Sequence, residues 1–496
     1  MRNAVQLITY ADRLAGDLPG LARLLGSPPW SDAFGGVHVL PFFTPFDGAD
    51  AGFDPIDHTQ VDPRLGSWDD VRTLGRDRDT VVDLIVNHVS ASSAQFQDVV
   101  AKGETSPYAP MFLTLGSVFP AGATEADLTR IYRPRPGLPF THRTLGGTPR
   151  LVWTTFTSEQ IDIDVRSAPG RAYLADVLDA LVAAGVSMVR LDAVGYAVKT
   201  AGTSCFMTDE TFEFIDELTA QARARGVDVL VEVHGHHAQQ VQVARRVDRV
   251  YDFALPPLVL HALYTGDGGP LARWMQMRPS NAVTVLDTHD GIGIVDVGPD
   301  PNDPARAGLL TGDQLAQLVT TLHHRTGGTS VAATGAAAAN LDLYQVNSTF
   351  YDAVGRDDRA YLLARAVQLF TPGIPQVYYV GALAGGNDLE LLARTGVGRE
   401  INRHRYTDAE LANELARPVV RSLFALASFR SRLPAFDGDF TFSADERARV
   451  LTYSWRAAES SATLVADLPA GSARVDWTWH ARRGTSSDLL ADPPRP

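Results

Sequence analysis

Cysteine is nearly absent from the chain: Cys205 is the only one among 496 residues. One cysteine cannot form an intramolecular disulfide, and it cannot build a zinc site from several thiolates. Proteins without disulfides are typical of compartments where thiols stay reduced, so we expect a cytoplasmic location.

Positive charge is also in deficit. The chain has 44 Lys and Arg residues against 58 Asp and Glu residues, which gives a net charge of −14 at pH 7. Surfaces that bind nucleic acids or anionic membranes carry an excess of cations. We therefore expect neither a nucleic acid nor a membrane as a partner, and an anionic substrate would need a locally basic pocket.

Long hydrophobic runs are missing as well. The uncharged stretch that best resembles a membrane span is Ala366–Asn387, and Gln368, Pro372 and Pro375 interrupt it. A span needs about 20 predominantly apolar residues, so we interpret this stretch as a helix end, a turn and a strand. The apolar run that precedes Asp12 is too short for a signal peptide.

The composition is that of a globular protein with a large core, 45% hydrophobic and 21% charged. Short apolar runs rich in β-branched residues alternate with amphipathic helical windows such as Arg171–Ala184 and Glu210–Arg225, which is typical of parallel strands joined by helices. Eight such strands predict an α/β fold, the closed (β/α)8 or TIM barrel. The expected strands are Val5–Tyr10, Val37–Leu40, Val81–Val86, Val186–Leu191, Val229–Val233, Arg249–Phe253, Val283–Leu286 and Gln376–Tyr379.

Two connections are too long for ordinary barrel loops. Residues 89–167 follow the third strand and residues 291–357 follow the seventh, so we expect two insertions at the C-terminal face, where barrel enzymes keep their active sites. The alanine-rich Ala332–Ala339 in the second is either a helix or a linker. Short alternating strands after residue 435 predict a small C-terminal all-β domain. The expected parts are 1–88, 168–290 and 358–435 for the barrel, 89–167 and 291–357 for the insertions, and 436–496 for the β domain.

Acidic residues stand directly after three of the expected strands: Asp192, Glu232 and Asp290. Each alone would more often cap the following helix. Together at one barrel mouth they suit glycosyl transfer, in which one carboxylate attacks the anomeric carbon and a carboxylic acid protonates the leaving oxygen. A separation of about 5–5.5 Å between Asp192 and Glu232 would give retention of configuration. Arg190 would keep Asp192 ionised by lowering its pKa.

Four segments resemble the signature segments of the α-amylase superfamily of retaining α-glucosidases. They are Asp83–His88, Arg190–Asp192, Glu232–His234 and Asp287–Asp290, and they occur in order on strands three, four, five and seven. Four further stretches, found in the strand ends and the long insertions, are similar to the sucrose phosphorylases within that superfamily. These are Gln6–Asp12, Leu40–Asp47, Arg133–Phe140 and Asn340–Asn347.

This resemblance implies phosphorolysis of sucrose to α-D-glucose 1-phosphate and fructose by double displacement, without a cofactor, in a protein that forms a homodimer. It implies Asp192 as nucleophile, Glu232 as acid/base and Asp290 as transition-state stabiliser. The implied acceptor side includes Arg135, Asp342 and Tyr344. Our own candidate for gripping phosphate is Arg135, because a guanidinium binds phosphate oxygens bidentately, with Tyr344 and His234 assisting. The implied glucose pocket consists of Asp50, Phe53, His88, Arg190, His289, Gln345 and Arg399.

Alternatives stay open at this point. A related phosphorylase acting on sucrose 6-phosphate, glucosylglycerol or glucosylglycerate would share these motifs, and so would an amylase-type hydrolase or transglucosidase. A barrel subunit without catalysis would not need all three carboxylates. The histidines in His234–His237 resemble a metal-ligand set, and Asn87 occupies a place where superfamily members often bind calcium, but a mechanism that uses only carboxylates needs no metal. We expect no metal site and interpret Asn87 as a structural hydrogen-bonding residue.

Overall fold

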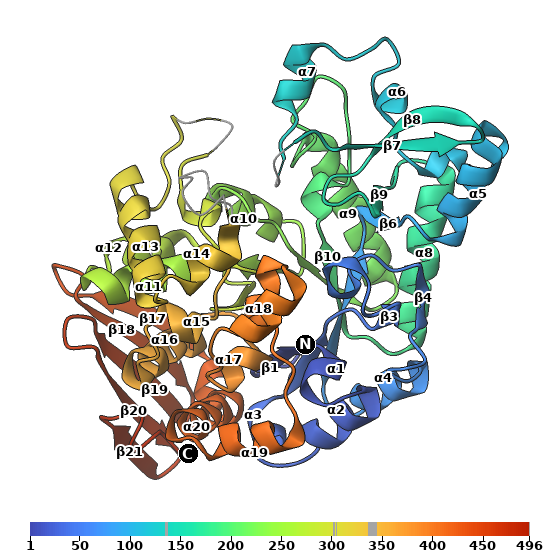
Figure 1. Cartoon of the computed structure of the whole chain (residues 1–496). Coiled ribbons are helices and arrows are strands. Elements are labelled where there is room, and N and C mark those ends of the chain that lie inside the picture. The colour runs from blue at the N-terminus through green and yellow to red at the C-terminus, as the bar shows by residue number, and fades with distance from the viewer. Residues whose placement is uncertain (134–136, 301–302, 304, 336–344, 496) are drawn as a thin grey trace.

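The computed structural model describes the whole chain except residues 134–136, 301–302, 304, 336–344 and 496 (Figure 1). Eight parallel strands close into a barrel in the order β1-β16-β13-β12-β11-β10-β5-β2, which confirms the predicted TIM barrel. Their bounds are β1 Gln6–Thr9, β2 Gly36–Val39, β5 Asp79–Ile85, β10 Met188–Asp192, β11 Asp228–Val231, β12 Arg249–Asp252, β13 Ala282–Thr284 and β16 Ile374–Tyr378.

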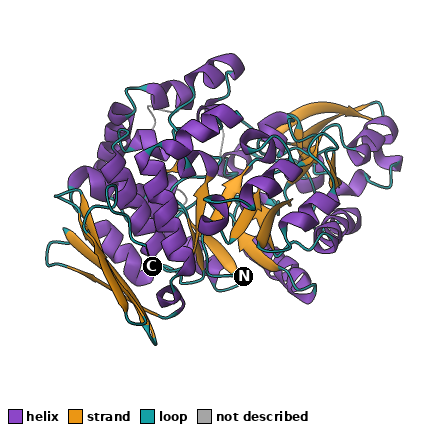
Figure 2. Ribbon diagram, turned by 90° about the horizontal axis from the view of Figure 1, so that it is seen from below, coloured by secondary structure: helices purple, strands orange, loops and turns teal. Residues whose placement is uncertain are grey.

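Helices surround the barrel and connect its strands (Figure 2). In α9, Thr208 caps the first turn and Phe212, Ile215 and Leu218 are buried, as the amphipathic window predicts. The stretch Ala366–Asn387 contains the end of α16, strand β16 and a short helix, and no helix among the described residues is long and apolar enough to span a membrane. The main connecting helices are α2 Leu18–Leu25, α4 Trp68–Leu74, α8 Ala168–Ala183, α9 Asp209–Ala224, α10 His237–Ala244, α11 Leu255–Thr265, α12 Gly269–Met277, α16 Asp358–Phe370 and α20 Pro418–Arg432.

The insertion after β5 forms a separate lobe, which rises at the upper right of Figure 1. Strand β6 (His88–Ser90) pairs with β9 (Gln160–Asp162), and this pairing attaches the lobe to the barrel mouth. A hairpin and three helices complete the lobe over a small core that includes Trp153 and Cys205. These elements are α5 Ala94–Lys102, α6 Leu115–Val118, α7 Glu125–Arg130, β7 Phe140–Leu145 and β8 Thr148–Trp153.

The insertion after β13 contains helices α13 and α14, the short helix α15 (Phe350–Ala353) and a short ladder. Strand β14 (Ile292–Gly293) pairs antiparallel with β15 (Gln345–Val346), so Gln345 is fixed near the barrel mouth. Helix α13 spans Gly312–Arg325 and α14 spans Thr329–Thr334. The first part of the alanine-rich stretch is therefore helical, and its residues 336–339 lie outside the described part of the chain.

The C-terminal domain is a five-stranded antiparallel sheet, as the alternating pattern predicts. Trp455 donates a hydrogen bond of 2.8 Å from Nε1 to the carbonyl of Phe370, which ties the sheet to the end of α16. In both views the sheet and the β5 insertion lie on opposite sides of the barrel (Figures 1 and 2). The strands are β17 Asp439–Ala444, β18 Val450–Ala457, β19 Ser460–Asp467, β20 Ser472–Trp479 and β21 Arg482–Ser486.

Polar side chains cross the interior of the barrel. His38 contacts the Asp83 carboxylate at 3.1 Å, and Tyr251 donates to Gln376 at 3.0 Å. Gln376 in turn donates to Gln6 at 2.7 Å. Hydrogen bonds of this kind offset part of the desolvation cost of holding charge below the mouth of the barrel.

A buried histidine next to this network predicts acid sensitivity. His58, in β4 (Asp57–Val61), packs edge-on against Phe43, and burial lowers its pKa to about 4. Below its ordinary pKa of about 6.5 the unfolded chain takes up a proton that the folded chain refuses, so this group lowers stability by about 1.4 kcal/mol per pH unit as the pH falls. We expect His58→Gln to flatten the fall in melting temperature between about pH 6.5 and pH 4.

The matched control is His480→Gln, at a histidine that is exposed on the C-terminal sheet. That variant should keep the wild-type slope of melting temperature against pH. An unchanged slope in His58→Gln would contradict the assignment of acid sensitivity to this residue.

Candidate active site

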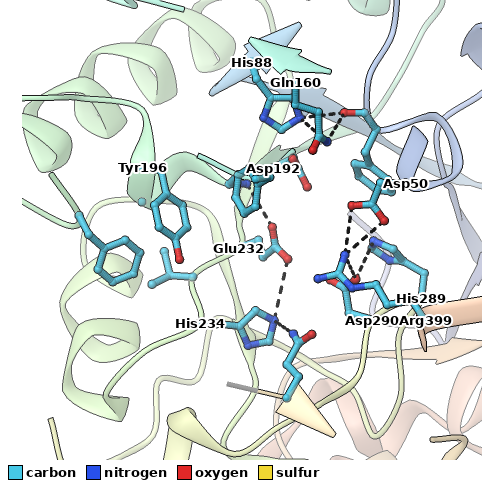
Figure 3. A pocket seen from close by; sticks show the side chains of 17 residues that line it. Asp50, His88, Gln160, Asp192, Tyr196, Glu232, His234, His289, Asp290 and Arg399 are labelled. Atoms are coloured by element: carbon cyan, nitrogen blue, oxygen red, sulfur yellow. Dashed lines mark hydrogen bonds and ion pairs between the residues drawn. The ribbon is translucent and has the colours of Figure 1, made fainter. Parts of the chain in front are cut away.

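A pocket opens at the C-terminal ends of the barrel strands (Figure 3). Ten of the residues singled out from the sequence line it: Asp50, Phe53, His88, Asp192, Glu232, His234, His289, Asp290, Gln345 and Arg399. Arg190 lies beneath this lining and is 2% exposed. Arg135, Asp342 and Tyr344 lie outside the described residues.

One guanidinium joins the carboxylates at the floor of the pocket. Arg190 Nη1 contacts Asp192 Oδ1 at 3.0 Å, and its Nη2 contacts Glu232 Oε1 at 2.8 Å. The same Nη1 also pairs with Asp83, which is the neighbour of Arg190 across the β10–β5 ladder. The planar fork of an arginine suits such a role because its donors point in fixed directions. The nucleophile and acid candidates are therefore held side by side.

The positions of these carboxylates follow from the backbone. Asp192 is the last residue of β10, and Glu232 directly follows β11. Ala193, next to Asp192, has a left-handed φ of 52°, and its N–H donates to Glu232 Oε2 at 3.2 Å. Such a conformation is costly for alanine and persists where the surroundings impose it. The turn after β10 thus helps to orient Glu232 towards Asp192.

Arg190 acts to lower the pKa of Asp192, as expected, but the expectation that this pKa is low is wrong. Burial and the charge of Glu232 raise the pKa of the Asp192 carboxyl well above its usual range, although Arg190 opposes this rise. The physical reason is that Asp192 is buried and that Asp83, Asp192 and Glu232 all face one guanidinium. Burial and the neighbouring carboxylates therefore favour the protonated form of Asp192.

Asp290 lies in a different electrostatic setting. Strand β13 already ends at Thr284, so Asp290 comes from the loop beyond it and not, as expected, from the residue directly after the strand. Arg399 contacts its Oδ1 at 2.8 Å, and Arg403 lies at 3.8 Å. Burial would raise the pKa of Asp290, but Arg399 together with His289, Arg403 and His234 outweighs it, and the pKa lies well below its usual range. Asp290 is thus kept ionised.

Two rings form one wall of the pocket. The rings of Phe53 and His289 are stacked with centroids 4.7 Å apart and planes 7° from parallel. Burial lowers the pKa of His289 to about 3, so this imidazole is neutral at ordinary pH. His88 approaches the carbonyl of Phe53 through Nε2 at 2.8 Å, and Gln160 lies 3.1 Å from the same nitrogen. The wall offers a flat apolar surface next to polar ring atoms.

The opposite edge is formed by His234. Its Nδ1 lies 3.0 Å from the Asp296 carboxylate, and its Nε2 lies 3.2 Å from the Gln345 amide. Burial lowers the pKa of an imidazole, but Asp296 outweighs this effect and raises the pKa of His234. Arg399 on the far side contacts Asp50 at 3.2 Å. Figure 3 shows these groups pointing into one space.

Sequence reasoning missed several contributors. The insertion supplies Phe156 and Gln160 to the lining, and the segment after β10 supplies Tyr196. Asp296, which holds His234, was also missed. Tyr196 had a usable signal, because it follows Asp192 by only a few residues. The other three stand in irregular sequence without a motif. The missed lining residues are Phe156, Gln160, Ala193, Gly195, Tyr196, Phe206 and Val233.

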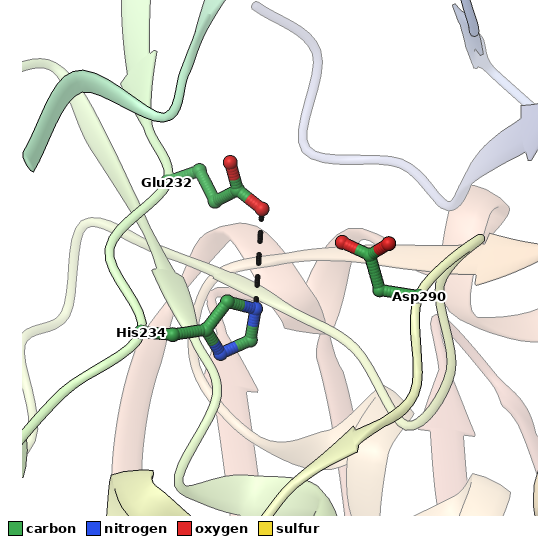
Figure 4. A group of neighbouring side chains, drawn as sticks. All are labelled: Glu232, His234 and Asp290. Atoms are coloured by element: carbon green, nitrogen blue, oxygen red, sulfur yellow. Dashed lines mark ion pairs between the residues drawn. The ribbon is translucent and has the colours of Figure 1, made fainter. Parts of the chain in front are cut away.

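Three ligand-type groups converge where a cation could be held (Figure 4). Glu232, His234 and Asp290 bring one candidate atom each to within 4.8 Å of one another. The two carboxylates already face Arg190 and Arg399, so their charge is compensated. A divalent ion would lie close to both guanidiniums and be repelled by them. The arrangement therefore suits hydrogen bonding to a polar ligand better than metal binding.

Asn87 makes a structural hydrogen bond, as interpreted from the sequence. Its Oδ1 accepts from the Lys199 ammonium at 2.7 Å. Asp162, on β9, contacts the same ammonium at 2.6 Å. These oxygens do not fit a calcium ion as the structure has them, because a lysine side chain occupies the place that the ion would take.

The chain is similar to known proteins along its whole length. A family model described as alpha amylase, catalytic domain, matches residues 33–255, and one described as sucrose phosphorylase, C-terminal, matches residues 435–494. The sucrose phosphorylase of Bifidobacterium adolescentis is 56% identical over 503 residues, which cover 100% of this chain and 99% of that protein. The glucosylglycerol phosphorylase of Marinobacter adhaerens is 40% identical, with 96% and 97% covered.

A solved structure agrees with this likeness. The crystal structure of sucrose 6F-phosphate phosphorylase from Thermoanaerobacter thermosaccharolyticum superposes with a TM-score of 0.90 at 38% identity, and the match covers 98% of each chain.

The charge compensation at Glu232 and Asp290 predicts indifference to metal ions. Dialysis of the wild-type protein against EDTA should leave its melting temperature unchanged, and added zinc or calcium should not raise it, because each carboxylate already has a cationic partner. Differential scanning fluorimetry measures this shift. A saturable rise with either ion would show that the three groups bind metal.

Proposed function

The chain belongs to the sucrose phosphorylase family within the α-amylase superfamily, and from this premise we propose that it catalyses the reversible phosphorolysis of sucrose to α-D-glucose 1-phosphate and D-fructose. The chain is an enzyme that transfers glycosyl groups with retention. The choice of sucrose and phosphate is our proposal for this chain. The observation that carries the proposed glucosyl transfer is the contact of one guanidinium with both Asp192 and Glu232 at the floor of the pocket.

The first half of the reaction needs one proton in the right place. Glu232 donates it to the fructosyl oxygen while the Asp192 carboxylate attacks the anomeric carbon, which forms a glucosyl-aspartate and releases fructose. Burial and crowding favour a proton on Asp192 in the free protein. The reaction requires Asp192 to be ionised and the proton to reside on Glu232. Arg190 faces both groups, so its positive charge stabilises the ionised Asp192 that attacks the sugar.

The second half reverses the roles. Glu232, now ionised, takes a proton from the attacking phosphate, whose oxygen displaces Asp192 from the anomeric carbon. Two inversions give net retention, so the product is the α-phosphate. Asp290 stays ionised beside the sugar, where its negative charge can stabilise the oxocarbenium-like transition state.

The remaining lining suits a glucosyl group. The stacked Phe53 and His289 provide a platform for the C–H face of the ring. Asp50 and Arg399, which already pair with each other, can accept from and donate to hydroxyls at the far end of the sugar. His88 and Gln160 offer further polar atoms on the insertion side.

The proposed acceptor side includes His234, which the structure describes, and three residues that lie outside its described part. His234, between Asp296 and Gln345, has a raised pKa and so favours the cationic form, which would attract phosphate. Arg135, Asp342 and Tyr344 remain predictions from the sequence. Arg135 is the candidate for gripping phosphate oxygens, because a guanidinium binds them bidentately.

Other phosphorylases of this fold are the main alternative. The glucosylglycerol phosphorylase reported above shares 40% identity with this chain, whereas the sucrose phosphorylase shares 56%. We therefore place sucrose first among the donors. We also propose that the protein is cytoplasmic and acts as a homodimer. Light scattering of the purified protein checks the dimer.

The direct experiment is product analysis. The purified protein is incubated with sucrose, with and without phosphate, and the products are identified by chromatography. We expect glucose 1-phosphate and fructose only when phosphate is present in excess. Rapid release of free glucose at the same rate in both reactions would identify a hydrolase. Cleavage of glucosylglycerol or sucrose 6-phosphate in preference to sucrose would identify a related phosphorylase.

Substitution of the two carboxylates should separate their roles. Asp192→Asn should abolish activity while leaving the melting curve cooperative, because an amide cannot form the glucosyl ester. Glu232→Gln should slow cleavage of sucrose by orders of magnitude but slow cleavage of α-glucosyl fluoride much less, since fluoride leaves without a proton. Initial rates with the two donors measure this difference. Equal losses of rate with both donors would show that Glu232 is not the acid that protonates the leaving group.

Substitution of Arg135 should affect phosphate alone. In Arg135→Ala we expect a strongly raised KM for phosphate, while slow hydrolysis of sucrose by water persists, because attack by water needs no anion site. Arg143→Ala is the matched control, since that arginine pairs with Glu159 in the same insertion and does not line the pocket. An unchanged KM for phosphate in Arg135→Ala would indicate that His234, and not Arg135, forms the anion site.

A further inference from the structure

An acidic residue directly follows Arg399 in the turn that reaches into the pocket. This turn is the 3-10 helix η7 (Gly398–Asn402), and the side chain of its Glu400 is only 11% exposed. The described lining of the pocket includes Arg399 but does not include Glu400. A buried carboxylate needs partners that replace its water, so the partners of Glu400 indicate what this residue does.

Two guanidiniums share the Glu400 carboxylate. Arg13, in helix α1 (Ala11–Leu14), binds it with two nitrogens: Nη1 donates to Oε2 at 2.8 Å, and Nη2 donates to Oε1 at 3.1 Å. Arg403 Nη1 donates to the same Oε1 at 3.4 Å. The two-pronged contact with Arg13 fixes the orientation of the carboxylate as well as its position. Glu400 therefore joins the helix after the first barrel strand to the turn that carries Arg399.

Arg403 reaches the pocket from behind its lining. Its side chain is buried, and its Nε donates to the carbonyl of His289 at 2.9 Å. Its Nη2 lies 3.5 Å from Asp50 Oδ1 and 3.8 Å from Asp290 Oδ1. Arg399 contacts the same two carboxylates from within the lining (Figure 3). The two carboxylates are thus held between two arginines, one in the lining and one behind it.

The backbone around the turn is tied to the same groups. Arg13 donates from Nη1 to the carbonyl of Arg403 at 2.6 Å, and the carbonyl of Arg13 accepts from the N–H of Tyr406 at 2.8 Å. Asn402 Nδ2 donates to the carbonyl of Asp290 at 2.8 Å. The turn and the loop that carries Asp290 are therefore connected through both backbone and side chains.

Opposite charges alternate from α1 to the pocket, and Glu400 lies between two cations in this series. The order of the charged groups is Arg13, Glu400, Arg403, Asp50 with Asp290, and Arg399. Without the Glu400 carboxylate, the guanidiniums of Arg13 and Arg403 would repel each other. A glutamine in its place would accept from one guanidinium and turn its amide N–H groups towards the other. Arg403 would then be displaced from the two carboxylates that it holds.

We propose that Glu400 is a positioning residue for the glucosyl group, because its pairing with Arg13 and Arg403 holds Asp50, Asp290 and Arg399 in place around the sugar. This inference rests on the proposed function, which assigns those three groups to the glucosyl part of the donor. His234, on the acceptor side, forms the opposite edge of the pocket. Glu400 should therefore affect the binding of the donor and not the binding of phosphate.

The experiment compares Glu400→Gln and Glu400→Asp with the wild-type protein. In Glu400→Gln we expect the KM for sucrose and the KM for α-glucosyl fluoride to rise on the order of tenfold, because both donors place the same glucosyl group in the pocket. The KM for phosphate should stay at the wild-type value. Glu400→Asp keeps a carboxylate between the two arginines, so it should recover most of the loss.

A double variant separates positioning from folding. Arg13→Gln combined with Glu400→Gln removes one positive and one negative charge, so its melting temperature should return towards the wild-type value. Its donor KM should stay raised, because Arg403 still lacks the carboxylate that holds it. Glu414→Gln is the matched control, since that residue pairs with Arg417 and lies outside the described lining of the pocket, and its KM values should not change.

Three results would overturn the proposal. The first is a donor KM in Glu400→Gln that is unchanged, or that rises no more than the KM for phosphate. The second is a donor KM in Glu400→Asp as high as in Glu400→Gln. The third is a donor KM in the double variant that recovers together with the melting temperature, which would leave Glu400 as a stabilising ion pair only.

A failure of the proposed sucrose activity would not be confused with these results. Hydrolysis of α-glucosyl fluoride needs neither fructose nor phosphate, so it gives the donor KM of each variant for any enzyme that transfers α-glucosyl groups from this pocket.

Discussion

The contact of the Arg190 guanidinium with three carboxylates is the interaction on which the active site depends. Asp83 supports it from the neighbouring strand, and Asp192 and Glu232 face it from the pocket side. Without this cation, three buried acids could not stay close together. With it, the two catalytic candidates stay adjacent. A retaining double displacement requires two carboxyl groups placed side by side in this way.

The same principle of local compensation extends through the mouth of the barrel. Asp290 is balanced by Arg399, His234 by Asp296, and Asp162 by Lys199. In a protein with a net charge of −14, cationic side chains thus lie directly against the acidic groups at this mouth. The pocket gains fixed dipoles and charges that need no reorganisation during reaction. Long-range repulsion of phosphate by the acidic surface is reduced by salt screening and by these local cations.

Much of this architecture could be predicted from local patterns. Apolar runs bounded by turn residues located all eight barrel strands, and the strand ends led to Asp192 and Glu232. Contacts that depend on register or on folded loops were not accessible: Asp83 meets Arg190 only because β5 and β10 are neighbours in that register.

The direction of the Asp192 pKa was wrong for the same reason. From the sequence Glu232 was expected near Asp192, but Arg190 was expected to pair with Asp192 as in an ordinary ion pair. The burial of Asp192 and the approach of Asp83 and Glu232 to the same guanidinium depend on the packed barrel mouth. Phe156 and Gln160 were missed because they come from an irregular insertion whose path the sequence pattern does not specify.

The configuration of the first-formed product tests the central claim most directly. Proton NMR during early turnover of sucrose with phosphate distinguishes α- from β-glucose 1-phosphate by the coupling of the anomeric proton. Carboxylates that are held together by Arg190 predict the α-anomer from the first moments of the reaction. Initial formation of the β-anomer would mean a single displacement and would contradict the account.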